Sequence, residues 1–214
     1  MSARTLAVAL LVVLATRADA QRISAGAQIA FAEYAEQGAS LHFDGAGPSG
    51  HVSLGWRRFD VSFSAARLSF ASTATDDVAE PFDVTQTELS LRVRATRLVS
   101  VEAGFLEREV APLHAAQSVA AIRLGALMAF PLAPGADVAV RASYLTGSRF
   151  SGGGSAPFGV QLGLGVSYAP WWERVRITGD LEFMRLDRRI ATEDGPVSTP
   201  IQSSTARLGV MIAY

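Results

Sequence analysis

The chain has 214 residues and a formal net charge of −1; it is 49% hydrophobic, only 18% charged and free of cysteine. The near balance of charge argues against nucleic-acid binding, which calls for a basic excess. The lack of cysteine excludes a disulfide framework and a thiolate metal site.

The first twenty residues have the features of a secretory signal peptide. Arg4 supplies the positive start, residues 6–15 form an apolar run, and Ala18-Asp19-Ala20 is a cleavage site that leaves Gln21 as the mature N-terminus. The run is too short to cross a bilayer as a helix, and no later apolar run approaches that length. We therefore predict a signal peptide over 1–20 and one domain over 21–214. An exported chain this apolar is expected to form either a membrane β-barrel or a soluble β-structure.

Ten segments alternate apolar and polar residues with the period of two that is typical of β-strands. They are 22–34, 51–57, 60–70, 85–95, 98–107, 119–130, 137–146, 158–168, 175–185 and 204–214. The third segment changes phase near Ala65-Ala66, which predicts a β-bulge. The connections span 16, 2, 14, 2, 11, 6, 11, 6 and 18 residues, so long and short alternate without exception. Such sorting predicts short turns at one end of a barrel and long loops at the other.

Aromatic residues favour a membrane barrel over a soluble one, because amphipathic rings collect at the two surfaces of a bilayer. At the ends of the strands next to short turns lie Trp56, Phe59, Phe130, Tyr168, Trp171 and Trp172, and next to long loops lie Phe31, Phe70, Phe105, Tyr144, Phe158 and Phe183. Two belts flanking an aliphatic band predict an aromatic girdle at each interface. A soluble exported ligand-binding barrel, with the apolar face inward, is the alternative.

If the apolar face meets lipid, the opposite face lines the lumen and carries charges of both signs. The predicted lumen charge network comprises Arg57, Glu88, Arg92, Arg94, Glu102, Arg123, Arg141, Arg176, Asp180, Glu182 and Arg207, with Asp60 and Asp137 on the same face. Buried charges need partners, so these groups are expected to pair across neighbouring strands. Glu88, Arg92, Arg94 and Glu102 lie on adjacent strands and form the first candidate cluster. A salt-bridged, plugged lumen is favoured over a narrow pore in which the arginines set ion preference.

The last segment, Ser204 to Tyr214, ends on an aromatic residue and resembles the closing strand of bacterial outer-membrane β-barrels. In that family the terminal aromatic is the sorting and assembly signal, which here would be Tyr214. The resemblance covers the whole mature chain and rests on pattern rather than on a motif. It implies an all-β, antiparallel, up-and-down transmembrane barrel of ten strands, with eight or twelve as alternatives. It also implies a location in a Gram-negative outer membrane, with both termini in the periplasm and the long loops outside the cell. The partners that it implies are outer-membrane lipid, lipopolysaccharide and the barrel-assembly machinery. We expect a monomer.

Function is less constrained than fold. We expect a non-enzymatic barrel with a structural or surface-interaction role, no cofactor and no metal. A narrow porin-like channel is one alternative. A rim enzyme on lipid or peptide, using His114 and the Asp76-Asp77 pair, is another. Omptin-type barrel proteases use acidic pairs and an Asp/His pair, and lipid-A-modifying barrels use a positioned His and Ser. No nucleotide loop or HExxH-type metal motif is present in the sequence.

Overall fold

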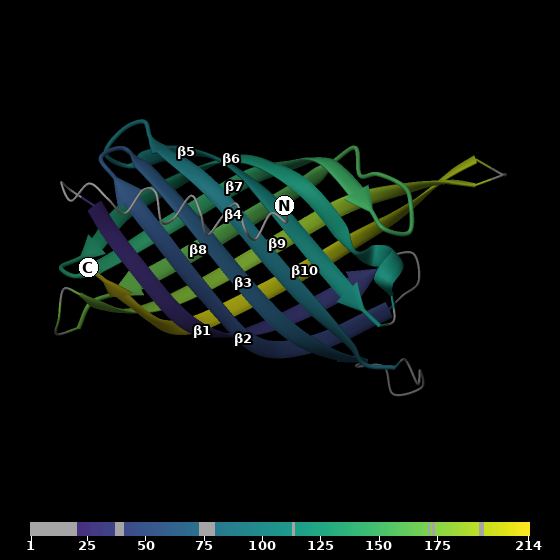
Figure 1. Ribbon diagram of the computed structural model, residues 1–214, viewed down its shortest axis with the longest axis horizontal. Helices are drawn as coiled ribbons and strands as arrows, with labels where there is room; N and C mark the ends of the chain where they lie inside the picture. Colours follow the sequence, from purple (N-terminus) through teal and green to yellow (C-terminus); the bar gives the residue numbers. More distant parts are fainter. Residues whose placement is uncertain are drawn as a thin grey trace, which may run out of the picture.

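The computed structural model describes residues 21–36, 41–72, 80–112, 114–170, 172, 174–192 and 195–214. These residues form a closed barrel in which every strand pairs antiparallel with its sequence neighbours and the first strand pairs with the last (Figure 1). The expected ten-stranded antiparallel barrel is therefore confirmed. The predicted signal peptide, 1–20, lies outside the described residues. Within the described ranges, no helix is long and apolar enough to cross a membrane.

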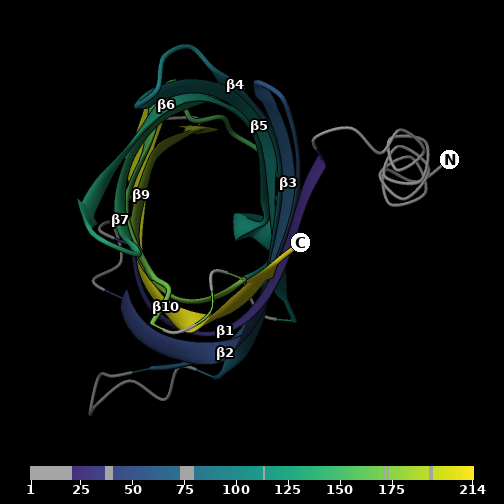
Figure 2. The ribbon, with the colours of Figure 1, turned by 90° about the vertical axis from the view of Figure 1, so that its left-hand side faces the viewer.

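All strands except β8 are longer than the sequence pattern indicates. They are β1 (Gln21–Glu36), β2 (Leu41–Trp56), β3 (Phe59–Ser72), β4 (Phe82–Arg94), β5 (Val99–Ala111), β6 (Val119–Ala133), β7 (Ala136–Phe150), β8 (Gly159–Tyr168), β9 (Val175–Thr192) and β10 (Gly195–Ala213), with one 3-10 turn, η1 (Ala115–Gln117), between β5 and β6. Viewed along its axis, the barrel is a complete ring with η1 lying inside it (Figure 2). Much of what the sequence pattern assigned to long loops is strand.

The two ends of the barrel are named here by their connections. The turn end carries the connections 57–58, 95–98, 134–135 and 169–174, together with the start of β1 and the end of β10. The loop end carries 37–40, 73–81, 112–118, 151–158 and 193–194, and β9 and β10 project farthest there (Figure 1). At the turn end, backbone hydrogen bonds between Ile23 and Tyr214 close the seam, with N···O distances of 3.1 and 2.7 Å.

The predicted β-bulge at Ala65-Ala66 is wrong. Both residues stay in continuous register, opposite Gly50 and Ser49 on β2 and opposite Thr87 and Gln86 on β4. The register shifts lie instead between β6 and β7, at Ala120/Ile122 and Pro131/Ala133. The second shift accommodates Pro131, which cannot donate to the ladder.

The change of pattern in β3 has another cause, which is a reversal of polarity along the strand. Towards the turn end, Phe63 points outward and Ser62 inward; towards the loop end, Arg67 points outward and Leu68 is buried inside. Successive side chains still alternate between the outside and the inside of the barrel, but the apolar residues move from the outward to the inward positions. Other strands show the same reversal, and it divides the barrel into two halves of opposite character.

Candidate functional site

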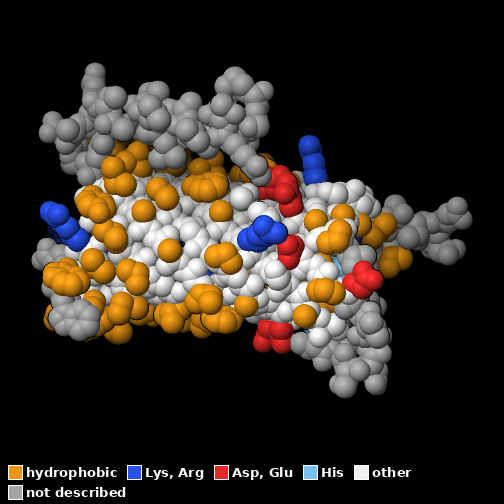
Figure 3. Space-filling model, turned by 60° about the horizontal axis from the view of Figure 1, so that its bottom comes forward, with side chains coloured by type: hydrophobic (Ala, Val, Ile, Leu, Met, Phe, Trp, Pro, Cys, Tyr) orange, Lys and Arg blue, Asp and Glu red, His pale blue; other side chains and the backbone are white. Residues whose placement is uncertain are grey.

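The exterior of the turn-end half is apolar. Large hydrophobic side chains from every strand are 39–59% exposed there, among them Ile29, Leu89, Val101, Leu124 and Leu181. On the face drawn in Figure 3, hydrophobic side chains gather mainly over the half of the barrel that carries the turns. Because a water-soluble protein rarely exposes a continuous apolar surface of this extent, the band is the face that meets lipid.

Aromatic rings flank the apolar band. At the turn end, Trp56 stacks on Phe59 with ring centroids 6.3 Å apart, and Tyr168, Trp172 and Tyr214 are also exposed. Among the other predicted girdle residues, Phe31, Phe105, Tyr144 and Phe158 point outward and are exposed, whereas Phe130 and Phe183 are half-buried. Trp171 lies outside the described residues.

The prediction for Phe70 is wrong. Its side chain is 1% exposed and lies inside the barrel, where its ring stacks on Phe82 at a centroid distance of 5.2 Å. The reason is the polarity reversal, since Phe70 lies beyond the point at which β3 turns its apolar residues inward. Phe43, Phe82 and Phe150, which the sequence pattern left in loops, are also buried within strands.

Outward positions just beyond the loop-end girdle are polar and mainly acidic, and are called here the collar. Glu33 pairs in register with Asp44, Glu107 and Glu109 follow Phe105 on β5, and Arg67 and Asp83 form an ion pair of 2.9 Å. Acidic side chains are visible at this level in Figure 3, next to the apolar half. The loop-end half therefore faces water on its outside.

The centre of the lumen holds a buried network around Arg123. Its side chain is 3% exposed and donates hydrogen bonds to Glu88 and to Oε1 of Gln161, the latter at 3.3 Å. Gln86 also donates to Glu88, at 2.8 Å. Arg123 lies on β6 and Glu88 on β4, so this pair spans an intervening strand rather than joining neighbours.

A second group surrounds Glu102, whose side chain is fully buried. Arg141 approaches its Oε1 to 3.1 Å, and Arg92 and Arg123 lie within 3.7 and 3.8 Å of the carboxylate. Ser143 donates to the same oxygen at 3.2 Å. One carboxylate is thus shared by three guanidinium groups, of which Arg123 also pairs with Glu88 and Arg92 with Asp60.

Further pairs line the rest of the turn-end half of the lumen. Arg207 and Glu182 form an ion pair of 3.1 Å, and Arg176 pairs with Asp137 nearer the turn end. Asp180 accepts a hydrogen bond of 2.9 Å from Gln28. Apart from Arg176, these residues border a cavity of about 600 Å³, which extends from Glu88 and Arg123 to Arg97 and Leu98 at the turn end.

Two residues of the predicted lumen network take no part in its ion pairs. Arg57 is in the two-residue turn between β2 and β3 with a φ of 52°, and Arg94 ends β4; both side chains are exposed at the turn end. The assignment of Arg57 to the interior is wrong, because it lies in the turn beyond β2. Arg94 is on the lumen-facing side of β4, in register with the buried Ser100, but at the end of the strand its side chain is exposed and forms no ion pair with a described residue. Arg92, one layer deeper, does point inward, where it lies 3.7 Å from Asp60.

The loop-end half of the lumen is filled by an apolar cluster, called here the plug. Its buried members include Tyr34, Phe43, Leu68, Phe70, Phe82, Val84, Leu106, Val110, Leu145, Met184 and Leu186. Tyr34, Phe43, Phe70 and Phe82 pack ring against ring with centroids 4.9–6.4 Å apart. Arg108 and Arg188 are buried with it, and their guanidinium carbons lie 4.7 and 4.8 Å from the ring centroids of Tyr34 and Phe150.

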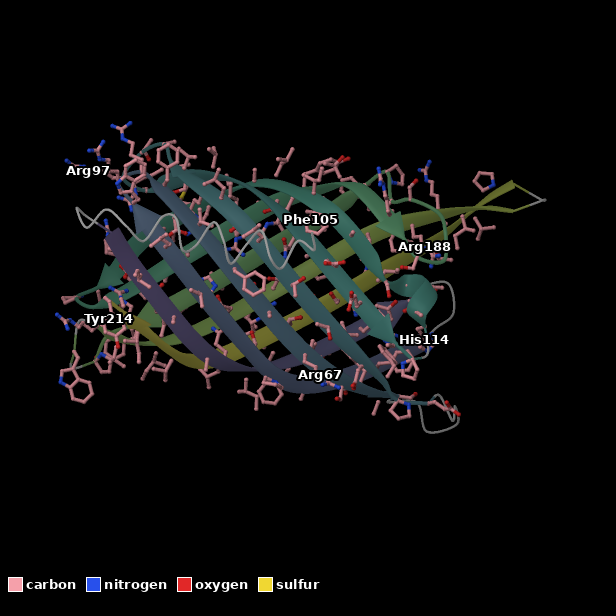
Figure 4. The ribbon with its side chains drawn as sticks, in the orientation of Figure 1. Arg67, Arg97, Phe105, His114, Arg188 and Tyr214 are labelled. Atoms are coloured by element: carbon pink, nitrogen blue, oxygen red, sulfur yellow. The ribbon has the colours of Figure 1, made fainter. Side chains whose placement is uncertain are left out.

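The turn η1 covers the plug from the loop end. Gln117 accepts a hydrogen bond of 2.6 Å from the Tyr34 hydroxyl and donates to Glu36, which ties the turn to β1. The ring of His114 packs against Phe43 and Phe82, with centroids 5.7 and 5.1 Å apart. Figure 4 places His114 and Arg188 at this end and Arg97 and Tyr214 at the opposite one. Asp76 and Asp77, the other rim candidates, lie outside the described residues.

No group of three or more His, Asp or Glu side chains suited to a metal ion occurs within the described part of the chain. The residues that sequence reasoning missed are those of the plug, together with Arg108, Arg188 and Gln117. A signal for them exists in the sequence: beyond Phe31, Phe63 and Phe105 the polar residues move to the outward positions of β1, β3 and β5.

The closed antiparallel ring, the apolar exterior band and the polar lumen beneath it define the class of this protein. It is an integral β-barrel of the bacterial outer-membrane type. No family model matches the chain, and no curated protein matches its sequence.

Solved structures with a similar arrangement are outer-membrane barrels. Neisserial surface protein A is 12% identical, with 89% of this chain and 96% of that chain covered and a TM-score of 0.43. Ail, the attachment invasion locus protein of Yersinia pestis, is 14% identical, with 90% and 98% covered and a TM-score of 0.42. The outer membrane protease OmpT from Escherichia coli is 7% identical, with 90% and 97% covered and a TM-score of 0.49. Values this low transfer no function to this chain.

Proposed function

We propose that the protein is a non-enzymatic outer-membrane barrel with a closed lumen, which serves as a membrane-embedded scaffold for a surface-exposed rim. The plug is the observation that carries this proposal. Hydrated ions do not cross a packed hydrocarbon constriction, and the aromatic rings of Tyr34, Phe43, Phe70 and Phe82 fill the loop-end half of the lumen. The ion pairs around Arg123 and Glu102 support it further, because they bind the wall strands to one another across the lumen.

Planar-bilayer conductance tests the closed lumen. The protein is purified in detergent, its folding is checked by the heat-dependent gel shift of such barrels, and it is inserted into a bilayer. We expect a folded barrel without steady current. Steady, ion-selective current would overturn the closed lumen and favour the narrow-channel alternative, with Arg92 and Arg141 as the groups that set selectivity.

The surroundings of His114 support a packing role rather than a catalytic one. Its ring contacts Phe43 and Phe82, and it precedes the turn that covers the plug. An activity on lipid A or on peptides that is lost in His114→Ala, while the gel shift is retained, would overturn the non-enzymatic part of the proposal.

We propose an orientation with the turn end in the periplasm and the loop end outside the cell. Short turns are typical of the periplasmic end of such barrels, and the polar collar supports exposure of the loop end to water. Because the chain has no cysteine, Ser151→Cys at the loop end and Ala95→Cys at the turn end each create a single labelling site. A bulky maleimide should label only the Ser151→Cys protein on intact cells, and labelling of the Ala95→Cys protein alone would refute this orientation.

A further inference from the structure

Arginines gather on one side of the turn end, where the start of β1 meets the β2–β3 and β4–β5 connections. They border a recess of about 230 Å³, called here the arginine recess, and are Arg22, Arg57, Arg58, Arg92, Arg94 and Arg97. In the described part of the chain, Asp60 is the one acidic residue that lines it. Asp60 lies 3.7 Å from Arg92, and none of the other five arginines forms an ion pair with a described residue.

The recess is held together by backbone and ring contacts rather than by charge pairing. The amide of Arg94 donates to the carbonyl of Arg58 at 2.8 Å, which fixes the two connections side by side. The stacked rings of Trp56 and Phe59 contribute to its wall. The recess continues into the lumen cavity, with which it shares Arg92, Arg97 and Leu127.

Deeper in that cavity the acidic groups are already engaged. Glu88 is bonded to Arg123, Glu182 to Arg207, and Asp180 to Gln28. Unpaired positive charge is therefore concentrated at the mouth, where a guanidinium can still present its planar donors to an incoming oxyanion.

Arg57 gives an independent sign that the recess is maintained for a purpose. Its φ of 52° is the left-handed conformation, which disfavours residues with a Cβ and which two-residue hairpin turns usually fill with Asn, Asp or Gly. Its guanidinium carbon lies over the ring of Trp56, 5.4 Å from the ring centroid, and Trp56 also lines the recess. Disfavoured backbone positions of this kind cluster where a binding role retains them.

We propose that the arginine recess is a binding site for an anion with clustered phosphate or carboxylate groups, entered from the turn-end side of the membrane. Two sources present this chemistry: a soluble polyanion, and the headgroup phosphate of an anionic lipid in the adjacent leaflet. None of the plug residues lines the recess, so the site is independent of whether the barrel conducts.

Calorimetric titration of the purified protein with pyrophosphate tests the proposal. The protein is kept in zwitterionic detergent at low ionic strength, because salt screens exposed charges. The test variant is Arg57→Asn/Arg97→Gln; asparagine tolerates a positive φ, so the turn is retained. The control is Arg149→Gln/Arg189→Gln, which removes the same charge from exposed positions at the loop end.

We expect saturable binding to the unaltered protein and to the control, and a loss of affinity of about tenfold or more in the test variant, since two charge-assisted contacts are removed. Absence of saturable binding, or equal affinity in the test variant, would overturn the site. Arg97→Gln alone, which leaves the β2–β3 turn intact, gives a second measurement if the double variant does not show the gel shift.

Nanodiscs distinguish the two sources. The titration is repeated in phosphatidylcholine discs with and without phosphatidylglycerol. If the unaltered protein binds pyrophosphate more weakly in the phosphatidylglycerol discs, and the test variant shows no such difference, the recess is assigned to a lipid headgroup. Equal binding in both kinds of disc assigns it to a soluble anion, and either result upholds the site.

Discussion

Arg123→Ala should lower the free energy of unfolding by about 3 kcal/mol. Its charge-assisted hydrogen bond to Glu88 contributes about 1.5–3 kcal/mol and its bond to Gln161 about 1 kcal/mol. Removing one partner of a buried pair typically costs about 3–5 kcal/mol, because the other charge is left without compensation. Glu88 keeps Gln86 as a donor and borders the lumen cavity, where water can reach it, so the low end of that range is expected.

Urea unfolding of the barrel in lipid vesicles measures this difference, followed by tryptophan fluorescence and by the gel shift. Midpoints are compared only where the slope of the transition is unchanged. Arg94→Ala is the matched control, since that arginine is exposed at the turn end, and it should stay within about 0.5 kcal/mol of the unaltered protein. Adding Glu88→Gln to Arg123→Ala removes the orphaned charge and should recover about 1–2 kcal/mol.

The reasoning is refuted if Arg123→Ala unfolds at the same midpoint as the unaltered protein, or if Arg94→Ala costs as much. If adding Glu88→Gln to Arg123→Ala recovers no stability, the stability lost in Arg123→Ala comes from packing rather than from charge.

Three further predictions concern the plug, the strand contacts and the seam. Phe82→Ala should lower the free energy of unfolding by about 3–5 kcal/mol and should admit a small current through the barrel. Phe105→Ala, which changes the exterior, should give no current in the conductance assay. Gly125→Ala should destabilise the barrel in the urea assay, because a Cβ there would lie 2.5 Å from the carbonyl oxygen of Ala142. Gly163→Ala should be tolerated in the same assay, because the nearest atom to its Cβ would be 3.4 Å away. If Tyr214 is the assembly signal that the sequence predicts, its deletion should lower insertion in cells more than refolding in vesicles, where only two backbone hydrogen bonds to Ile23 are lost. Equal effects in both measurements would count against that role.

Strand number, pairing order and facing in the turn-end half were predictable from the sequence. In β4 the exposed Leu89 and Leu91 alternate with the buried Glu88 and Ser90, as the period of two requires. That periodicity is strong because the two faces meet different environments, lipid outside and a polar lumen inside. It does not depend on any distant contact.

Pairing of the lumen charges was not predictable in the same way. Long side chains reach across the lumen, so Arg123 on β6 meets Glu88 on β4, and Arg141 on β7 meets Glu102 on β5. The expected cluster of Glu88, Arg92, Arg94 and Glu102 assumed contacts between adjacent strands. Only Arg92 and Glu102 of that cluster approach each other, at 3.7 Å. Which carboxylate an arginine meets depends on the tilt of the strands and on the reach of its side chain. The alternation of residues along each strand carries no information on either.

The loop-end half was misjudged because its pattern belongs to another kind of barrel. On β5 the outward series runs Val101, Ala103, Phe105 and then Glu107, whereas the inward series changes from Glu102 to the buried Leu106. Phe105 therefore marks the upper edge of the apolar band on that strand, and the chain beyond it is arranged like a water-soluble barrel with an apolar core.

The two halves are consequently stabilised by different forces along the same strands. In the loop-end half, burial of the plug away from water is the main favourable term, as in a soluble protein. In the turn-end half the exterior is solvated by hydrocarbon, so hydrogen bonds and ion pairs inside the lumen carry the specificity of packing. A soluble barrel and a membrane barrel were competing interpretations of the sequence because each pattern is present in it. On β1, β3 and β5, the position at which the membrane-barrel pattern gives way to the soluble-barrel pattern marks the level of the membrane surface along the barrel.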